Sequence, residues 1–358
     1  MEKDNSQRVF GLDILRTLAI ILVLLGHSSG IICPAFPRFP WIPLPDGVDL
    51  FFVLSGFLVG GMLMDGIRSD GQLSFTDLRQ FIRRRWFRTL PNYFLFLFIN
   101  IILVNQGIIF GELNRHLVTF FFFLQNFHIS YFDLFTESWS LSVEEWFYLS
   151  FPILCFLFLK IRKVKFSSAS LLLIISGYLL FPLLYRILTA GTINTDEHYE
   201  LFFRKLVLTR QDSIGFGILA AWFKRRNPSL WLRFRLPAFV AGIVSLFFLC
   251  RMHTEPATFY LKTLHLTFLP LSIALLLPAL DGVKTEKLPG KPFAFISRIS
   301  YSMYFCNSLI FQIYYHYFHP ETAIIRLVSF AGSWLAIILI SWLNFRFFEL
   351  PMTRLRDK

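Results

Sequence analysis

The sequence predicts an all-α protein that crosses a membrane about ten times and forms a single domain over residues 1–358. Two observations support this prediction. First, 55% of the residues are hydrophobic, 45 are phenylalanine and only 16% are charged, which is more apolar surface than a soluble chain of this size can bury. Second, the apolar residues gather in runs, most of them close to the ~20 residues that a membrane-spanning helix needs. The runs cover 9–30, 47–64, 86–105, 117–127, 141–160, 168–188, 206–223, 236–251, 264–280, 297–318 and 324–346.

The basic residues between these runs decide between ten and eleven spans. The run 117–127 has only eleven residues, and if it does not cross, every strongly basic loop falls on the side of Lys3 and Arg8. Because basic loops favour the cytoplasm, we expect about ten spans in the inner cell membrane, with both termini cytoplasmic and 117–127 as a re-entrant or interfacial segment. The basic loops are 65–85, 160–165, 224–235, 284–298 and 354–358.

Composition also excludes several classes of protein. The formal charge of +12 is explained by these loops, which contact membrane lipid, so we expect no nucleic-acid partner. The four cysteines are scattered without metal-ligand spacing, and His316 and His319 have no third ligand nearby, so no metal site is expected.

The first span, FGLDILRTLAIILVLLGHSS, contains Arg16 and His27 eleven residues apart. Eleven residues are close to three helical turns, so both side chains share one face, roughly 16 Å apart along the axis. Ionisable groups in a span usually face a protein interior or a water-filled cavity. The alternative is that Asp13, Arg16 and His27 reach the lipid headgroups from the two ends of the helix. The shared face favours an interior site.

Four arginines stand within residues 83–88 at the cytoplasmic entry of the third span. Arg85 and Arg88 share a helix face, as do Arg84 and Arg88, and arginines so placed repel one another unless an anion lies between them. Guanidinium groups bind phosphate oxygens in pairs, which fits a nucleotide-type ligand. An anchor for anionic lipid headgroups is an equal alternative.

The run SWSLSVEEWFY places Glu144 and Tyr148 one helical turn apart. Adjacent Glu145 points about 100° away from Glu144, so only one of them need face the interior. A carboxylate here could orient an imidazole such as that of His27. The alternative is helix capping by Ser140, with the glutamates in the favourable first turns.

Two further stretches contain possible supporting residues. Asp49 opens a span whose Gly56 and Gly60 have the spacing that allows close helix contact, so we interpret this span as mainly structural. Arg210 and Asp212 lie so close in sequence that we expect them chiefly to neutralise each other. Together these features predict an ionisable cavity, which a membrane-embedded enzyme and a secondary transporter would both have.

The motifs resemble the acyltransferase 3 family of integral-membrane O-acyltransferases. The resemblance rests on FGLDILRTLAIILVLLGH, GVDLFFVLSGFL, the Arg85–Arg88 pair, SWSLSVEEWFYLSFP, ISYSMY and FFELP, in family order from residue 10 to 351. It implies transfer of an acyl group, commonly acetyl, from cytoplasmic acyl-CoA to a sugar hydroxyl of a polysaccharide, lipopolysaccharide or related glycan. Acyl-CoA would be a co-substrate rather than a bound cofactor, and the acceptor would be a glycan or lipid-linked sugar.

The resemblance also implies that the Arg16–His27 and Arg85–Arg88 pairs are essential. Three departures stand out. Asn307 replaces a histidine common in the family, Leu309 a proline, and Glu137 stands near the place of another histidine. Because the sequence stops seven residues after Pro351, we expect the acceptor reaction to be completed in the membrane domain or by a partner.

On this basis His27 is predicted to be a general base or a transient acyl carrier, tuned by Glu144 or Glu145. Arg16 would stabilise the thioester oxygen or the ligand phosphates, and Arg84, Arg85 and Arg88 would hold the CoA phosphates. Asp49, Tyr148, Arg210 and Asp212 are possible supporting residues. A transporter or flippase of an acylated or sugar-containing molecule is the alternative, although no inverted repeat supports it.

Overall fold

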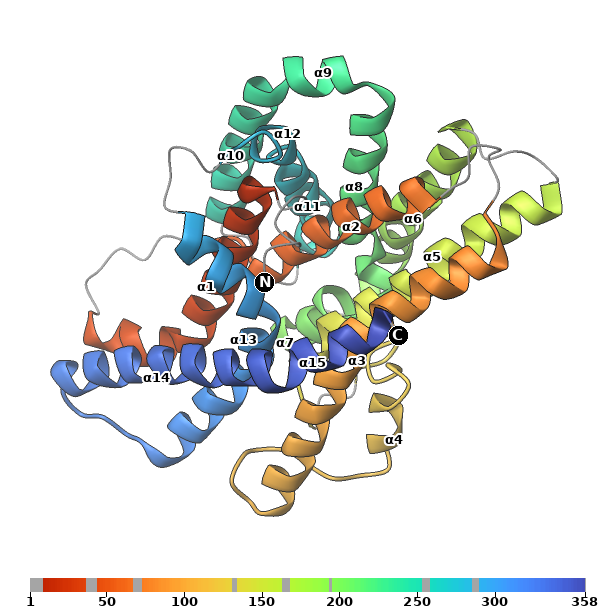
Figure 1. Cartoon of the computed structure of the whole chain (residues 1–358). Helices are drawn as coiled ribbons and strands as arrows, with labels where there is room; N and C mark the ends of the chain where they lie inside the picture. Colours follow the sequence, from red (N-terminus) through yellow and green to blue (C-terminus); the bar gives the residue numbers. More distant parts are fainter. Residues whose placement is uncertain are drawn as a thin grey trace.

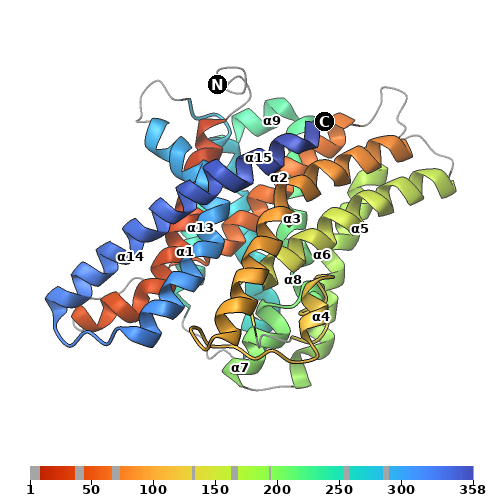
Figure 2. The same ribbon diagram turned by 60° about the horizontal axis from the view of Figure 1, so that its bottom comes forward.

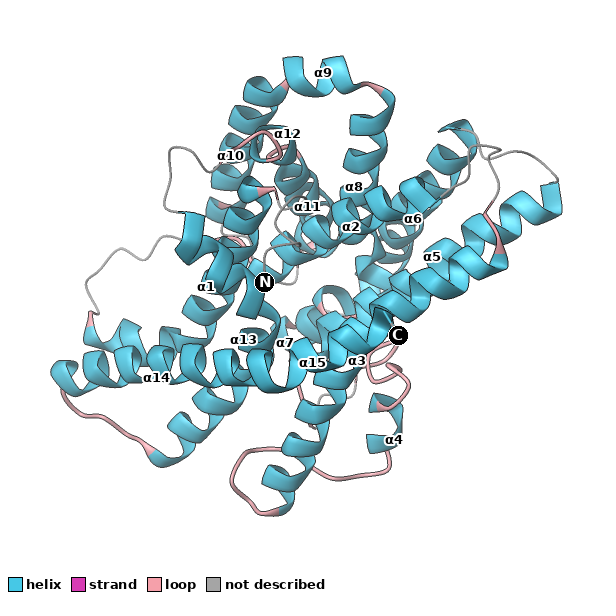
Figure 3. Ribbon diagram, viewed as in Figure 1, coloured by secondary structure: helices cyan, strands magenta, loops and turns pink. Residues whose placement is uncertain are grey.

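The computed structural model describes residues 9–36, 44–66, 73–130, 134–162, 168–192, 195–252, 258–284 and 290–357. These residues form helices joined by turns, without a strand among them, which confirms the all-α prediction (Figure 3). Lys3, Arg8, Lys163 and Lys165, on which the predicted orientation partly depends, lie outside the described residues.

Long helices form at the ten predicted spans (Figure 1). They are α1 (Phe10–Ile32), α2 (Gly47–Gly66), α3 (Phe75–Asn105), α5 (Ser138–Arg162), α6 (Ser168–Thr189), α8 (Val207–Arg226), α10 (Arg235–Arg251), a π-helical turn (Leu261–His265) continuing into α11 (Leu266–Ala274) and α12 (Leu277–Leu280), α13 (Gly290–Tyr317) and α14 (Ala323–Asn344). The short elements are α4 (Leu117–Phe120), α7 (Asp196–Tyr199), α9 (Pro228–Arg233), α15 (Leu350–Arg354), π-helical turns at Glu200–Arg204 and Phe345–Glu349, and 3₁₀ turns at Cys33–Ala35, Ala190–Thr192 and Leu355–Asp357.

Within the described residues, seven helical segments are long and apolar enough to cross a membrane, so the count of about ten is not confirmed. The segments are Phe10–Ala35, Gly47–Gly66, Phe75–Asn105, Ser138–Ile161, Ser168–Thr189, Leu261–Leu280 and Ala323–Arg354. The other three predicted spans fall short for different reasons. Helix α10 has only 17 residues. Helix α8 carries several charged residues, and α13 buries many hydroxyl and amide side chains inside the bundle. The predicted short segment 117–127 contains only the four-residue helix α4, which cannot span a bilayer.

The two ends of the bundle separate the connections as the sequence predicts. Figure 2 shows α9 and α15 at one end, and α4 and α7 at the other. The basic 224–235 loop and the C-terminal helix therefore lie at one end, and the segments that contain α4 and α7 lie at the other. Which end faces the cytoplasm stays a prediction.

Glycines bring α2 against α8 in the centre of the bundle. A Cβ on Gly56 would lie 2.0 Å from the backbone oxygen of Ile214, and one on Gly217 would lie 2.0 Å from that of Val53. Neither position can hold a larger residue unless the helices separate. The structural interpretation of Gly56 is thus confirmed, and small residues here allow close backbone contact.

Helix α3 begins with a capping box that sets where its arginines fall. The Ser74 hydroxyl accepts from the backbone N–H of Asp77 at 3.1 Å, and the Asp77 carboxylate accepts from the Ser74 N–H at 3.0 Å. These reciprocal bonds satisfy two otherwise unpaired donors of the first turn. From this fixed start, Arg85 and Arg88 fall one turn apart on the part of α3 that packs near α5 and α13.

Candidate active site

A cavity bounded by α1, α2, α3, α5 and α13 brings together predicted site residues from distant parts of the sequence. We call it the arginine cavity, lined among others by Arg16, Arg85, Arg88, Glu144 and Tyr148. Ser55, Thr89, Ser140, Tyr301 and Tyr304 add hydroxyl groups to its wall. Arg84 is exposed and is not among the residues that line it. The first span, the arginine cluster and the SWSLSVEEWFY stretch therefore do pack together.

Arg85 is positioned by aromatic and hydroxyl groups. Its guanidinium lies 5.3 Å from the ring centroid of Tyr148, a cation–π contact that links α3 to α5. One turn further along α3, the Thr89 hydroxyl contacts the Arg85 backbone oxygen at 3.1 Å and the Glu145 carboxylate at 2.6 Å. The backbone oxygen of Thr89 also accepts from the Tyr301 hydroxyl at 2.9 Å, so α13 holds the same turn.

Arg16 is held from α13. Its Nη1 donates to the Ser297 hydroxyl at 3.3 Å and lies 4.0 Å from Asp13 Oδ1, while Ser297 donates to that carboxylate at 2.6 Å. Asp13 and Ser297 thus fix the direction of the Arg16 side chain, which lines the cavity. The prediction that Arg16 faces the protein interior is confirmed.

The two adjacent glutamates of α5 point apart, as their helical spacing predicts. Glu144 lines the arginine cavity, whereas Glu145 is only 5% exposed and accepts a hydrogen bond from Thr89. A single carboxylate therefore faces the arginines. Glu145 instead joins α5 to α3 through its hydrogen bond with Thr89.

A second cavity adjoins the first. We call it the histidine cavity, lined among others by His27, Asp46, Glu137, Trp139 and Arg204. Val48 and Tyr304 line both cavities, so these two side chains stand between them. The Tyr304 hydroxyl donates to the Glu137 backbone oxygen at 3.0 Å and lies 2.8 Å from the Ser140 hydroxyl. The dividing residue is thus attached to the start of α5.

The expected partner of His27 is corrected by the structure. Its Nδ1 lies 2.5 Å from Oδ1 of Asn307, whereas Glu144 lines the other cavity and Glu145 contacts Thr89. Helix α5 begins at Ser138, so Glu144 already lies about 9 Å along the helix, at the level of Arg16 rather than His27. The prediction that Glu144 or Glu145 tunes His27 is therefore wrong, because this depth along α5 separates both carboxylates from the imidazole. Asn307, one of the three departures from the family pattern, is the residue that contacts His27.

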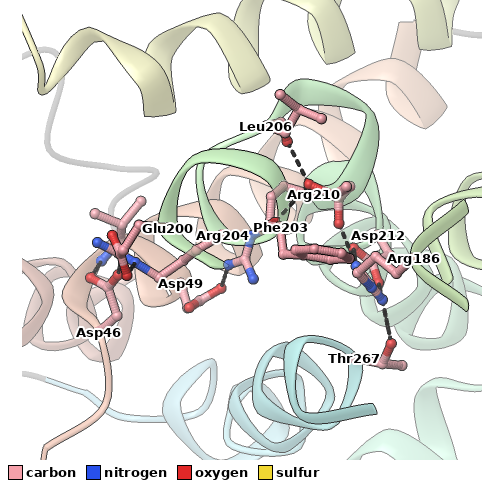
Figure 4. Close-up of polar contacts among 12 residues, drawn as sticks. Asp46, Asp49, Arg186, Glu200, Phe203, Arg204, Leu206, Arg210, Asp212 and Thr267 are labelled. Carbon is pink, nitrogen blue, oxygen red and sulfur yellow. Dashed lines mark hydrogen bonds and ion pairs between the residues drawn. The ribbon is translucent and has the colours of Figure 1, made fainter. Parts of the chain in front are cut away.

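Asp46, Arg204 and Lys205 add charged groups to the wall of the histidine cavity. Figure 4 draws the contacts among Asp46, Glu200 and Arg204. Arg204 pairs with Asp46 and, through Nε, with Glu200 at 2.6 Å, and Lys205 lies 3.3 Å from Glu200. Arg204 also lies 5.4 Å from the ring centroid of Trp139. Burial alone would raise the pKa of Glu200, but Arg204 and Lys205 outweigh it and hold that pKa below its ordinary value.

The supporting residues form two buried ion pairs on α8, drawn in Figure 4. Arg210 pairs with Asp49 of α2, and Asp212 pairs with Arg186 of α6 at 2.6 Å. Arg186 also donates to the Thr267 hydroxyl at 2.5 Å. The expectation that Arg210 and Asp212 neutralise each other is therefore wrong. Side chains two positions apart on a helix point about 200° away from each other, so Arg210 and Asp212 face different neighbouring helices.

Four residues of these networks were not singled out as site candidates: Arg186, Arg204, Tyr304 and Asn307. Arg186 could have been found, since a charge inside the apolar run 168–188 itself indicates an interior partner. Tyr304 belongs to the quoted ISYSMY motif. Arg204 gave no signal without the fold, because its partner Asp46 lies 158 positions away. Asn307 stood out as a departure from the family pattern, but its contact with His27, 280 positions away, could not be predicted.

The fold and the cavities define a polytopic helical membrane protein with two adjoining polar cavities, one rich in arginine and one containing histidine. Comparison with protein families then gives a specific result. The model described as an acyltransferase domain, that of the acyltransferase 3 family, matches residues 9–345. The chain belongs to this family.

Similar curated proteins carry names of one kind. The chain is 26% identical to the peptidoglycan O-acetyltransferase OatA of Listeria monocytogenes, over 98% of this chain and 56% of that protein. It is 26% identical to a putative O-acetyltransferase of Staphylococcus aureus, over 96% of this chain and 57% of the relative. It is 27% identical to the putative peptidoglycan O-acetyltransferase YrhL of Bacillus subtilis, over 82% of this chain and 47% of that protein. The chain thus spans about half the length of the curated relatives it matches.

Proposed function

We propose that this protein is a membrane O-acyltransferase that moves an acyl group, acetyl in the first instance, from cytoplasmic acyl-CoA to a sugar hydroxyl of a cell-surface glycan. The observation that carries the proposal is that the arginine cavity and the histidine cavity meet at Val48 and Tyr304. A phosphate-binding group and a proton-accepting group therefore lie in adjoining spaces. Membership of the acyltransferase family and the names of the relatives support the same reaction.

The donor is assigned to the arginine cavity by its charge. Arg85 and Arg88 line one wall from α3, and Arg16 lies in the wall from α1. Guanidinium groups bind phosphate oxygens in pairs, so they suit the phosphates of CoA. Glu144 and Tyr148 would hold Arg85 in place rather than act on His27.

The acceptor is assigned to the histidine cavity. His27 would take the proton of the sugar hydroxyl as that oxygen attacks the thioester carbon, after which the C–S bond breaks and CoA leaves as thiolate. Alternatively, His27 attacks the thioester carbon first, so that the C–S bond breaks and CoA leaves as thiolate. The acylated imidazole then passes the acyl group to the sugar oxygen, and the released imidazole nitrogen takes the proton of that hydroxyl. In both versions Arg16, roughly 16 Å from His27 along α1, would bind ligand phosphates in the arginine cavity rather than touch the reacting carbonyl.

The test uses the purified full chain in proteoliposomes, with radiolabelled acetyl-CoA and a soluble glycan fragment as acceptor. His27→Ala should lower the transfer rate by about 10²–10⁴-fold, the usual contribution of a general base. His198→Ala is the matched control, because His198 contacts Thr195 in the short helix α7 region and does not line either cavity. A His27→Ala protein that transfers at the wild-type rate would remove His27 from the mechanism.

A transporter or flippase is the second candidate, because adjoining cavities through a bundle also suit a transported molecule. The two functions differ in their chemistry. A transferase consumes acetyl-CoA, by slow hydrolysis even without acceptor, whereas a transporter leaves it intact. Release of free CoA that requires His27 therefore separates them in one measurement. We propose the inner membrane, with the arginine cavity open toward the cytoplasm, as the setting of the transferase.

A further inference from the structure

We propose that Asn307 is a positioning residue that fixes the tautomer of His27, with the proton on Nδ1 and the lone pair on Nε2. The use made of Nε2 rests on the proposed function, because a general base and an acyl carrier both act through the nitrogen with the lone pair. The tautomer itself depends only on the hydrogen bonds around Asn307.

The orientation of the Asn307 amide follows from its partners within α13. Its Nδ2 lies 2.9 Å from the backbone oxygen of Met303 and 2.5 Å from that of Tyr304. Backbone oxygens only accept hydrogen bonds, so the NH₂ group of the amide must face them. The amide oxygen, Oδ1, is therefore the atom that faces His27.

The proton on His27 follows from the same argument. Oδ1 of an amide has no hydrogen and can only accept, and it lies 2.5 Å from His27 Nδ1. Nδ1 must then be the donor. In a neutral imidazole the other nitrogen, Nε2, carries the lone pair. His27 also lines the histidine cavity, where an acceptor hydroxyl would be bound.

The Asn307 side of this contact is enclosed, whereas His27 is exposed at the histidine cavity. Asn307 is 0% exposed, so water does not compete for its amide. The Tyr315 hydroxyl, two turns further along α13, donates to the His27 backbone oxygen at 3.0 Å. Trp334 of α14 donates to the hydroxyl of Ser28 at 3.3 Å. The end of α1 is thus fixed by two neighbouring helices.

An amide does for His27 what a carboxylate does in other sites, with one difference. Either group can accept from Nδ1 and fix the ring orientation. A carboxylate also adds a negative charge that stabilises the protonated ring, whereas the Asn307 amide adds none. The expected glutamate partner is thus replaced by a neutral amide, which orients the ring through Nδ1 without adding a charge beside it.

The test is ¹⁵N NMR of the full chain in nanodiscs with ¹⁵N-labelled histidine, recorded without substrate. The His27 signals are identified by their loss in His27→Ala. In the wild type, Nδ1 should give the protonated signal and Nε2 the unprotonated one. Asn307→Leu should shift the population toward Nε2–H and lower kcat by about ten- to a hundredfold, with KM for acetyl-CoA unchanged. Gln312→Leu is the control on the same helix, since that amide contacts Ser308 and does not line the histidine cavity.

Asn307→Asp supplies a second variant, because its carboxylate can still accept from Nδ1. It should keep the Nδ1–H tautomer that Asn307→Leu loses. A wild-type spectrum with the proton on Nε2, or an unchanged tautomer in folded Asn307→Leu, would overturn the inference, and the wild-type spectrum decides alone if the variants do not fold. An Nδ1–H tautomer in a protein that never consumes acetyl-CoA would instead support this inference and overturn the proposed function.

Discussion

Helix α8 and the arginine cavity both use arginine, but in different surroundings. At the cavity Arg85 is half-buried and Arg88 is exposed. Arg210 and Arg186 are each 0% exposed, and each contacts a carboxylate, Asp49 or Asp212. Among the residues that the structure describes, Arg85 and Arg88 form no ion pair, although Glu144 lines the same cavity. Each arginine of the two ion pairs is matched by a carboxylate. Under the proposed function, a ligand phosphate would balance the charge of Arg85 and Arg88 instead.

The difference shows how an ionisable residue inside a membrane protein is to be interpreted. A buried arginine with its own carboxylate has no remaining charge to offer, so it joins helices. Arginines gathered around a cavity without such partners repel one another and bind an anion that relieves the repulsion. The number of arginines in a span does not separate the two cases. Their partners do.

The largest expected effect comes from opening one of the closed pairs. Arg210→Met leaves Asp49 as an unpaired carboxylate between α2 and α8, which typically costs about 3–5 kcal/mol. We expect a much lower unfolding temperature in detergent and a poor yield of monodisperse protein, measured by thermal unfolding and gel filtration. Transfer activity would fall only in proportion to the folded fraction.

The matched control for this change removes both charges. In Asp49→Leu/Arg210→Met no charge is left unpaired, so most of the lost stability should return. If the double variant is no more stable than Arg210→Met, the two residues are not energetically coupled. The conclusion that Arg210 and Asp49 stabilise the fold as a pair would then be wrong.

A smaller and different effect is expected in the arginine cavity. Arg88→Lys keeps the charge but loses the paired hydrogen bonds, so KM for acetyl-CoA should rise about tenfold, or ~1.4 kcal/mol, with no change in unfolding temperature. Arg84→Lys is the control, because exposed Arg84 is not among the residues lining the cavity. An unchanged KM in Arg88→Lys would make Arg88 a lipid anchor, the alternative that the sequence left open.

Much of this arrangement could be predicted from the sequence, for a physical reason. Hydrophobic runs and helical periodicity are local, so the positions of the long helices, the shared face of Arg16 and His27, and the divergence of Glu144 and Glu145 all follow from spacing. That α2 makes a close helix contact follows similarly from small residues such as Gly56, whereas its partner α8 is known only from the fold.

The choice of partners could not be predicted, because it depends on how helices lie at different depths and angles. Asp212 pairs with Arg186, 26 positions away, rather than with Arg210 beside it. His27 contacts Asn307, 280 positions away, which stands where a histidine is common in the family. Spacing along one helix fixes the direction of a side chain, but the residue that meets it belongs to another helix.

The smallest effect is expected for the ion pairs of Glu200 with Arg204 and Lys205 near the histidine cavity, which are partly exposed to solvent. Glu200 contacts Arg204 at 2.6 Å and Lys205 at 3.3 Å, and these cations hold its pKa below the ordinary value despite partial burial. A lowered pKa means that the ion pairs stabilise the fold above the unfolded pKa of about 4.3, and that this stability is lost as the pH falls through the lower folded value. Glu200→Gln should therefore unfold at a slightly lower temperature near pH 6 and lose less on acidification than the wild type, whereas the exposed control Glu197→Gln should follow the wild type. The measurement is the unfolding temperature of each protein across this pH range. If the wild type and Glu200→Gln give parallel profiles, solvent already screens these ion pairs and they add no stability. Only the fully buried ion pairs of this protein would then stabilise the fold.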